Sequence, residues 1–389
     1  MNALHVIPAL ATRYGGPSAA TLGMCRALEG AGVRTLIAAT DADGSGRLDV
    51  RVGREEAFGG IPAIFFRRHL GEAFKWSSGM AGWLRRNAAR FDVVHVHAVF
   101  SHSSLAAGSA ARRAGVPYIV RPLGTLDPWS VKRKSQRKRL LLALGGRVLL
   151  THAARMHYTS EDEQRLAESV IRGLPAGGVI PVGIDDDYFD IVPCRDPAAP
   201  IVLSLSRLDE KKRIDVLIDA FHQAAAARER DSWRLVIAGD GPTALVAHLK
   251  SLAAQGPARD RITFSGWVSG TNKVELFRRA SLFALPSHQE NFGISAAEAM
   301  ASAVPVLVTP GVNLARDVEQ AGAGWVVGEP VASVAAGLMA AMRDAAERER
   351  RGRQARSIAE RFRWKNVGRS LADLYGQVGR DRRSAETRI

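Results

Sequence analysis

Two acidic residues in the second half of the chain, Glu290 and Glu298, are separated by seven residues in a segment that reads as strand, loop and helix. The helix is expected to begin at Gly293 and Ile294, where free backbone N–H groups and the positive end of the helix dipole favour an anion such as a phosphate. A carboxylate accepts hydrogen bonds from two neighbouring hydroxyl groups, so one acid could bind a sugar and the other a ribose. Taken singly, Glu290 could be a helix-entry acid and Glu298 a solvated helix residue.

Cations that suit a phosphate follow another predicted strand, Ile201 to Ser206. Arg207 stands at the carboxyl end of this strand, and Lys212 precedes a predicted helix over residues 214–225. A diphosphate leaving group gains negative charge as its bond to a sugar breaks, and preorganised cations stabilise that transition state. A solvated basic turn is the structural alternative for this segment.

Glycines in two other loops would let the backbone approach a ligand closely. Gly15 and Gly16 follow the first predicted strand and precede a helix over residues 18–30. Gly266 follows a predicted strand over residues 261–265 and stands two residues before Val268.

Together these segments resemble the retaining glycosyltransferases of family GT4, the group 1 glycosyl transferases. The acidic segment is similar to the family's E-x7-E motif, and Arg207 with Lys212 to its R-x4-K motif. The resemblance implies that Glu290 contacts the transferred sugar, that Glu298 holds the ribose hydroxyls and that the two cations bind the diphosphate. It also implies donor contacts for a set of loop residues, namely Gly15, Gly16, Gly266, Val268, Asn291, Phe292, Gly293 and Ile294.

The pattern departs from the family at two positions. Family members usually have a glycine where Arg213 stands, and many carry a histidine where this chain has Leu123. Leucine neither exchanges a proton nor donates a hydrogen bond, so the role of that histidine is absent or is met by Asp127, Arg121 or His97.

The candidate catalytic residues are therefore Glu290, Arg207, Lys212, Asp127 and His97. His95 and His97 alternate on a predicted strand, Val93 to His97, and we predict that they lie on opposite faces, with one in the core and His97 in a cleft. Asp127 could equally begin a turn before Pro128.

Chain length and the alternation of short apolar strands with amphipathic helices predict an α/β chain of 389 residues with two domains. The resemblance implies the GT-B fold, in which two Rossmann-like domains with parallel sheets face an interdomain cleft. We expect an N-terminal acceptor-binding domain over residues 1–189 and a C-terminal nucleotide-sugar-binding domain over residues 190–362. A crossing helix and tail are expected over residues 363–389.

The net charge of +15 indicates an anionic partner, which could be nucleic acid, a membrane surface or a phosphorylated substrate. Six of the eight residues from Lys132 to Arg139 are basic, and the apolar run Leu140 to Leu150 follows them. This pattern suits an anionic membrane surface, with a solvated helix face as the structural alternative. No aromatic interleaving accompanies the cluster, so nucleic acid is not expected.

The cysteines and the apolar runs limit the cellular compartment and the metal sites that the sequence allows. Cys25 and Cys194 are too few and too far apart in sequence for a disulfide framework or a four-ligand zinc site, which fits a reducing cytoplasm. No export signal or membrane span is visible, so we expect a cytoplasmic protein or one bound peripherally to the inner face of the membrane. By the resemblance we expect no essential metal or cofactor, with the nucleotide sugar as substrate.

We therefore predict a retaining glycosyltransferase that moves a hexosyl group from a UDP- or GDP-linked sugar to a glycan or polyprenyl-diphosphate-linked acceptor. The resemblance places it in bacterial exopolysaccharide or O-antigen assembly. The rivals are an epimerase or phosphorylase on the same fold, and a catalytically silent sugar-nucleotide-binding partner of a membrane glycan-assembly complex.

Overall fold

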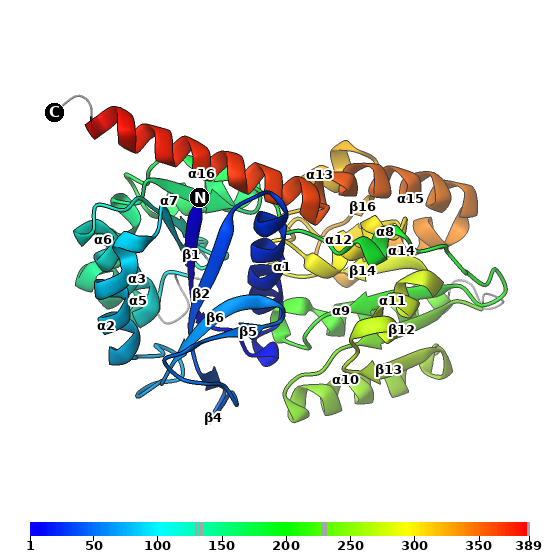
Figure 1. The fold of residues 1–389 in the computed structure, drawn as a ribbon. Coiled ribbons are helices and arrows are strands. Elements are labelled where there is room, and N and C mark those ends of the chain that lie inside the picture. Colours follow the sequence, from blue (N-terminus) through cyan, green and yellow to red (C-terminus); the bar gives the residue numbers. More distant parts are fainter. Residues whose placement is uncertain (129–130, 132–134, 227–231, 387–389) are drawn as a thin grey trace. The chain divides into compact units, whose positions relative to one another are not determined.

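The computed structural model describes residues 1–128, 131, 135–226 and 232–386 (Figure 1). The chain forms two compact units, one of Met1–Gly183 with Trp364–Ile389 and one of Ile184–Arg363. The predicted boundary at residues 189 and 190 lies within the second unit. Helix α8 (Asp186–Phe189) belongs to that unit because the Tyr188 ring packs edge-on against Phe277, with 5.5 Å between ring centroids.

The first unit is built on an eight-stranded sheet with the order β10-β9-β8-β7-β1-β2-β6-β5. All neighbours are parallel except β5 and β6, which form an antiparallel pair at one edge. The strands are β1 (Asn2–Ala9), β2 (Arg34–Thr40), β5 (Glu55–Phe58), β6 (Ile61–Phe66), β7 (Val93–His97), β8 (Tyr118–Arg121), β9 (Arg155–Tyr158) and β10 (Gly177–Val179). A separate two-stranded hairpin is formed by β3 (Ala42–Asp43) and β4 (Gly46–Arg47).

Helices cover both faces of this sheet, as the period-two alternation of its buried strands requires. Ala3 and Ile119 pack against α1 (Gly16–Gly30) and α16 (Trp364–Glu386), and Figure 1 shows α16 running along the first unit. Leu4 faces the other way, into a core shared with α2, α3, α6 and α7. These are α2 (Ser78–Asn87), α3 (His102–Arg113), α6 (Arg147–Thr151) and α7 (Glu161–Val170), with α5 (Ser135–Leu141) before α6.

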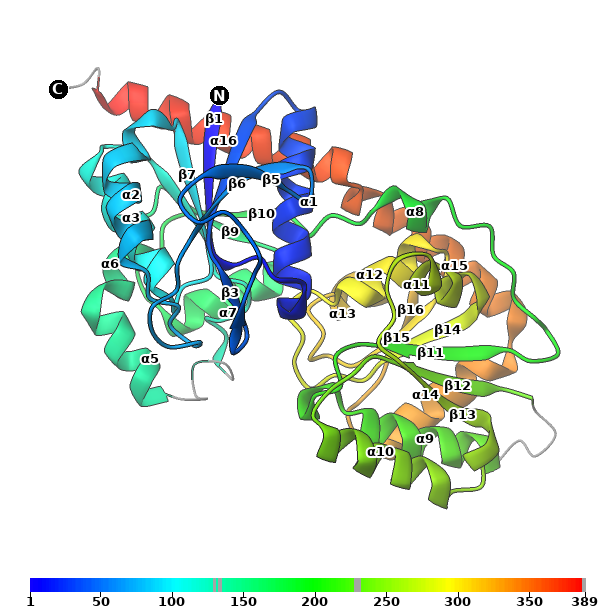
Figure 2. The same cartoon turned by 60° about the horizontal axis from the view of Figure 1, so that its bottom comes forward.

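The second unit holds a six-stranded, fully parallel sheet with the order β13-β12-β11-β14-β15-β16. Its strands are β11 (Ile201–Leu205), β12 (Arg234–Ala238), β13 (Ile262–Gly266), β14 (Ala280–Leu285), β15 (Val306–Val308) and β16 (Gly324–Val326). One face packs on α9 (Ile214–Ala226), α10 (Thr243–Gln255) and α14 (Val331–Arg343). On the other face, Phe277 of α11 (Gly270–Arg279) contacts Phe283 of β14. The remaining helices are α12 (Ile294–Ala301), α13 (Ala315–Gln320) and α15 (Ala345–Ala359), drawn in yellow to orange in Figure 2.

Each sheet has one topological switch point, where the order of successive strands reverses. In the first unit it lies between β1 and β7, and in the second between β11 and β14. Ligands of open parallel sheets bind outside the carboxyl ends of the strands at such a point. The loops after these four strands are therefore where a site is expected, and the predicted α/β class with parallel sheets in two domains is confirmed.

Candidate functional site

The loop between β14 and α12 carries Glu290 and is held in place by backbone hydrogen bonds. Glu290 N donates to Gly311 O at 2.8 Å, and Asn313 N donates to Glu290 O at 3.1 Å. A Cβ added to Gly311 would lie 2.1 Å from His288 O, so only glycine allows the two segments to approach this closely. The carboxylate of Glu290 therefore extends from a fixed backbone at the switch point of the second sheet.

Lys212 lies in the loop that follows the other strand at that switch point, β11, and its ammonium forms an ion pair with the Glu290 carboxylate. The Lys212 side chain is 9% exposed and that of Glu290 is 19% exposed. Burial lowers the pKa of Lys212 to about 7, and the charges of Lys211 and Arg207 act in the same direction. The Glu290 carboxylate favours the charged ammonium, because an opposite charge in contact stabilises the ionised form.

Arg207 stands directly after β11 and is exposed to solvent. The loop around it is bonded to the loop after β12, since Ser206 N donates to Ala238 O at 3.1 Å and Leu208 N donates to Asp240 O at 2.8 Å. A Cβ on Gly239 would lie 1.8 Å from Ser206 O, which explains the glycine there. Arg207 and Lys212 thus come from one short loop, with Arg207 open to solvent and Lys212 turned inward.

Arg213 adopts a left-handed backbone conformation, with φ 50° and ψ 43°, where the 3₁₀ turn Glu210–Lys212 ends and α9 begins. Glycine adopts this region without steric cost, whereas an L-residue with a side chain is strained there. The family's glycine at this position therefore has a conformational reason, and the chain keeps that loop shape with arginine in its place.

Helix α12 begins at a left-handed glycine, Gly293, with φ 82°, and no side chain caps its first turn. Ile294 and Ser295 are half-buried, whereas the ring of Phe292 is buried against Phe362. The Phe292 side chain is thus occupied by packing, and backbone N–H groups are what this turn offers an anion. Asn291 is half-buried beside them.

Glu298 lies one turn further into α12 and is 6% exposed. Its Oε1 accepts a hydrogen bond from Lys273 Nζ at 2.6 Å, while Oε2 accepts none in the structure. Burial raises the pKa of Glu298, and the Lys273 charge opposes the shift. The nearby Glu298 carboxylate in turn adds to the effect of burial in raising the pKa of Tyr188.

Sequence reasoning missed Lys273 and Tyr188. The ammonium of Lys273 lies 5.5 Å from the centre of the Tyr188 ring, so Glu298, Lys273 and Tyr188 form one cluster. A lysine in the first turn of the helix after the Gly266 loop was the available signal, whereas nothing near Tyr188 in the sequence points to Glu298.

The loop after β13 contains Gly266, at φ 65°, whose carbonyl accepts a hydrogen bond from Gly239 N at 2.7 Å. Val268 is half-buried and Trp267 is 58% exposed. The loops after β11, β12 and β13 are therefore joined side by side at the carboxyl edge of the second sheet.

In the first unit, Gly15 and Gly16 lie after β1 at the start of α1. Gly15 has φ 69° and ψ −134°, a conformation that is essentially restricted to glycine, and no side chain caps the helix. These two glycines sit at the switch point of the first sheet, as a phosphate-approaching loop would require.

His97, the last residue of β7, is fully buried and belongs to a chain of polar side chains inside the first unit. Its Nε2 lies 3.0 Å from His5 Nδ1, and His5 Nε2 lies 3.2 Å from Tyr375 Oη. The chain continues from Tyr375 Oη to His95 Nδ1 at 2.7 Å and from His95 Nε2 to His157 Nδ1 at 3.2 Å. It ends where His157 Nε2 meets Ile180 O at 3.0 Å.

The donor-to-acceptor direction along this series of hydrogen bonds follows from its last member, His157. A carbonyl oxygen only accepts, so His157 Nε2 donates to Ile180 O, and for neutral rings each preceding group must donate to the next. Burial lowers the pKa of His5 and of His157 to about 3 and holds the pKa of His95 and His97 well below the usual range, which keeps the rings neutral. His97 Nδ1 is left as an acceptor without a partner in the structure.

The prediction that His95 and His97 lie on opposite faces is wrong. Their rings stack with centroids 4.5 Å apart, because residues two apart in a strand point to the same face. Nitrogens of His5, His95 and His97 lie within 4.8 Å of one another, which is the one metal-ligating group of three among the described residues. Buried Arg121 lowers the pKa of these rings by its positive charge, and the same charge disfavours a cation there.

The loop after β8 carries Leu123, at the position of the family histidine, and Asp127. Leu123 is left-handed, with φ 56°, and Gly124 N donates to Glu163 Oε1 at 2.6 Å. Asp127 is 6% exposed, and its carbonyl accepts a hydrogen bond from Val131 N at 2.9 Å, as at the start of a helix. Residues 129, 130 and 132–134 lie outside the described residues, and with them part of the basic run Lys132 to Arg139.

Within the second unit, the structure brings Glu290, Lys212 and Arg207 together at the carboxyl edge of the sheet, with Glu298 deeper in the same helix that Gly293 begins. The first unit carries Gly15, Gly16, His97 and Asp127 on its own carboxyl edge.

No helix among the described residues is both long and apolar enough to cross a bilayer.

Solved structures with this architecture define the GT-B class of fold. Anabaena HepE in complex with UDP-glucose matches with a TM-score of 0.76 and 18% identity, covering 97% of this chain and 100% of that protein. Sucrose-phosphate synthase from Thermosynechococcus elongatus matches with a TM-score of 0.78 and 18% identity, covering 97% and 99%.

Two family models match the sequence. Glycosyl transferases group 1 matches residues 194–358, and the glycosyl transferase 4-like domain matches residues 15–183. The chain belongs to the group 1 glycosyl transferases and is a glycosyltransferase by class.

Curated relatives agree with this placement. D-inositol 3-phosphate glycosyltransferase from Nocardia farcinica is 29% identical over 77% of this chain and 64% of its own length. Mannosylfructose-phosphate synthase from Agrobacterium fabrum is 24% identical over 64% of this chain and 59% of its own length. The chain thus aligns with somewhat less than two thirds of the length of these two relatives.

Proposed function

We propose that this chain transfers a hexosyl group from a UDP- or GDP-linked sugar to a glycan or lipid-linked acceptor. The ion pair of Lys212 with Glu290 at the switch point of the second sheet supports the proposal most directly. A lysine and a carboxylate there, beside the open first turn of α12, provide what a sugar diphosphate needs: cation, N–H donors and a hydroxyl acceptor.

Arg207, Lys212 and the N–H groups at Ile294 would neutralise the departing diphosphate. Glu290, oriented by its contact with Lys212, would accept hydrogen bonds from sugar hydroxyls, and the backbone of Asn291, Phe292 and Gly293 would face the sugar and phosphate. Lys212, Glu290 and the backbone of their loops are held by an ion pair and hydrogen bonds before the donor arrives, so they stabilise developing charge with little reorganisation.

Glu298 would hold the ribose, because its Oε2 is buried without a hydrogen-bond donor and a ribose hydroxyl can supply one. The backbone beside Gly266 and Val268 would meet the base. In the first unit, Gly15 and Gly16 would approach phosphate or acceptor. Asp127 stays a catalytic candidate, and the burial of His97 favours a supporting role for it.

We infer transfer with retention of configuration, in which the acceptor hydroxyl attacks from the face that the diphosphate leaves. The leaving phosphate would take the hydroxyl proton, which requires no side chain at Leu123. Relatives named for D-inositol 3-phosphate and for mannosylfructose-phosphate, together with the net charge of +15, support an anionic acceptor. Bacterial exopolysaccharide or O-antigen assembly at the inner face of the membrane is the proposed setting.

Thermal unfolding with UDP, GDP and ADP tests the donor site. One nucleoside diphosphate should raise the melting temperature, because at a concentration of 100 Kd it stabilises the folded state by about 2.7 kcal/mol. UDP is the first to try, because HepE was solved with it. Failure of all three to bind would overturn the proposal.

Donor hydrolysis separates an enzyme from a silent binding partner. The wild type should release UDP or GDP slowly from the donor sugar without acceptor, Glu290→Ala should abolish release, and the exposed control Arg343→Ala should not change it. Binding without any release would identify a silent partner, and turnover unchanged by Arg207→Ala and Lys212→Ala would refute the proposed chemistry.

A further inference from the structure

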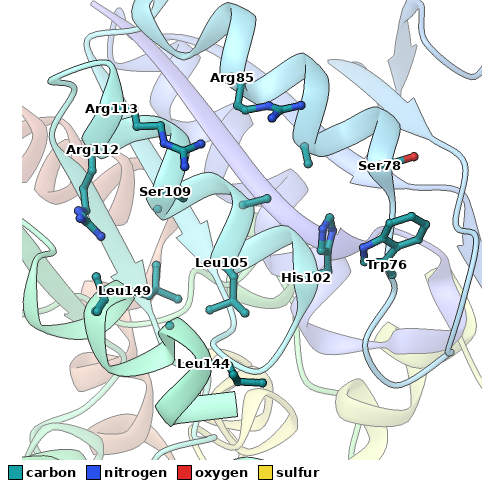
Figure 3. A pocket seen from close by; sticks show the side chains of 15 residues that line it. Trp76, Ser78, Arg85, His102, Leu105, Ser109, Arg112, Arg113, Leu144 and Leu149 are labelled. Atoms are coloured by element: carbon teal, nitrogen blue, oxygen red, sulfur yellow. The ribbon is translucent and has the colours of Figure 1, made fainter. Parts of the chain in front are cut away.

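A pocket of about 530 Å³ lies in the first unit between α2, α3 and the segment Leu142–Thr151 (Figure 3). Its floor is apolar, with Leu105 of α3 and Leu149 of α6. A Cβ on Gly108 would lie 2.4 Å from Leu149 Cδ1, so this glycine lets the two helices approach. The segment is kinked at Leu144 and Gly145, whose backbone is not helical, and Leu144 lines the pocket.

Arginines without an ion-pair partner among the described residues line one side of this apolar floor. Arg85, Arg112 and Arg113 line the pocket and no aspartate or glutamate does. None of these three guanidinium groups has an ion pair or hydrogen bond with another described residue. In Figure 3 the arginines lie along the α2–α3 side of the pocket and Leu144 lies on the opposite side. An unpaired arginine cluster favours a phosphate, which it can bind through paired N–H groups.

Apolar side chains that face solvent continue the pocket outward. Of the lining residues, Leu144 and Val148 are 67% and 38% exposed, and Trp76 at the end of the pocket is 36% exposed, while Leu140, four residues before Leu144 in the sequence, is 57% exposed. Exposed leucines in one neighbourhood, flanked by basic residues, are typical of a surface that enters the boundary of a lipid bilayer.

Further basic residues stand beside this surface. Arg137 and Arg139 of α5 are exposed, and Lys138 Nζ lies 5.0 Å from the centre of the Phe100 ring. Nucleic acid fits less well, since a phosphate backbone leaves exposed leucines in water. The combination of an apolar floor, unpaired arginines and an apolar rim fits a molecule with a phosphate and a hydrocarbon chain.

We propose that this face of the first unit docks on an anionic phospholipid bilayer, with one lipid seated in the pocket. The lipid phosphate lies against Arg112, Arg113 and Arg85, and its chain lies against Leu105 and Leu144. The purpose of docking rests on the proposed function, because a lipid-linked acceptor is presented at a membrane. The chemistry of the pocket stands on the first unit alone.

Sedimentation of the full chain with vesicles tests the proposal. Wild type should bind vesicles of phosphatidylcholine with 30% phosphatidylglycerol much more strongly than vesicles of phosphatidylcholine alone. This binding should weaken as the salt concentration rises. Arg112→Ala with Arg113→Ala should weaken binding roughly 30-fold, from two cations near an anionic surface. The control pair Arg34→Ala with Arg54→Ala removes the same charge from exposed positions outside the pocket and should weaken binding far less.

The apolar part has its own test. Leu144→Ser with Val148→Ser should weaken binding roughly tenfold, because two side chains lose their apolar burial in the bilayer. Leu70→Ser with Val192→Ser, which removes apolar groups that are at least as exposed but lie outside the pocket, should not. Equal losses in test and control pairs, or no preference for phosphatidylglycerol, would overturn the proposal.

The same variants separate this proposal from the donor site. The shift in melting temperature caused by UDP or GDP should be unchanged in all four pairs, because none of the eight positions is among the residues proposed to bind the donor. A wild type that binds vesicles but no nucleotide would refute the proposed function and leave the docking surface standing.

Discussion

The two sheets share a strand order that reverses once near the middle, yet they place polar groups differently at that point. The first sheet buries four histidines and Tyr375 completely, as neutral rings that hydrogen-bond to one another. The second sheet carries charged pairs at its rim: the side chains of Lys212 and Glu290 are 9% and 19% exposed, and the side chains of Lys273 and Glu298 are 21% and 8% exposed.

Depth explains the difference. His5 and His95 point from the middle of strands, where a charge would lose its hydration, so only neutral groups that satisfy one another are tolerated. Lys212 and Glu290 stand on loops beyond strand ends, where their ion pair opposes the cost of burial and both groups stay within reach of a ligand. The first arrangement stabilises a fold, and the second is suited to chemistry on a phosphate.

Acid should affect the two units unequally, and this is the largest expected effect. The folded-state pKa values of His5 and His157 are about 3, below the unfolded value of 6.5, so the unfolded chain binds more protons between those limits. The stability from these rings is complete above pH 6.5 and is lost as pH falls toward 3. Two histidines at about 1.4 kcal/mol per pH unit give a loss of about 4 kcal/mol by pH 5.

Hydrogen exchange read by mass spectrometry distinguishes the units in this experiment. Amides of β1 and β7 should lose protection between pH 7 and pH 5, after correction for intrinsic exchange, well before those of β11 and β14. Equal loss in both sheets would show that the buried histidines do not set the acid sensitivity.

Removing a charge from the second rim should affect catalysis instead. Lys212→Met keeps much of the side-chain volume but removes the cation beside the proposed diphosphate, and donor hydrolysis should fall 100- to 1000-fold. Lys250→Met, at an exposed position on α10, is the matched control and should hydrolyse donor at the wild-type rate. A Lys212→Met enzyme with unchanged kcat would remove this pair from the mechanism.

Breaking the histidine chain at its tyrosine should affect stability. Tyr375→Phe removes the donor to His95 and the acceptor for His5, leaving two buried groups unsatisfied, at a cost of about 2 kcal/mol in the free energy of unfolding. Tyr118→Phe, another buried tyrosine, loses a bond to a backbone carbonyl and should cost about 1 kcal/mol. Urea unfolding compares the two, and a Tyr375→Phe protein no weaker than Tyr118→Phe would contradict the cooperative chain.

The sequence was sufficient for the elements whose signal is local. The predicted strands Arg34 to Thr40, Val93 to His97 and Tyr118 to Arg121 coincide with β2, β7 and β8, because buried parallel strands are continuous apolar runs. The short β10 at one edge and the β5–β6 hairpin at the other were not predicted. The edge strands β5 and β10 bury less and carry a weaker apolar pattern, whereas β6 is an apolar, buried run whose signal was present in the sequence and was overlooked.

The parts of the proposed site whose geometry follows from sequence spacing could be predicted. The parts that depend on contacts between residues far apart in the sequence could not. Glu290 and Glu298 share one loop and one helix, so their relation follows from the chain. Lys273 reaches Glu298 across 25 positions, and Tyr375 reaches His5 across 370, which no local pattern encodes. The wrong faces for His95 and His97 came from misapplying the strand period, under which residues two apart share a face. The sequence itself held the information needed.

The smallest expected effect concerns the loop that joins Arg207 to α9. Arg213 is left-handed, so Arg213→Gly relieves backbone strain, whereas Arg213→Ala retains it, and both variants lose the same ion pair with Asp215. The glycine protein should therefore be more stable than the alanine protein by up to about 1 kcal/mol, less the greater chain entropy of glycine when unfolded. Thermal unfolding of both variants measures this difference. An alanine protein as stable as the glycine protein would show that the loop relaxes out of the left-handed region, and the inward position of Lys212 would then not depend on it.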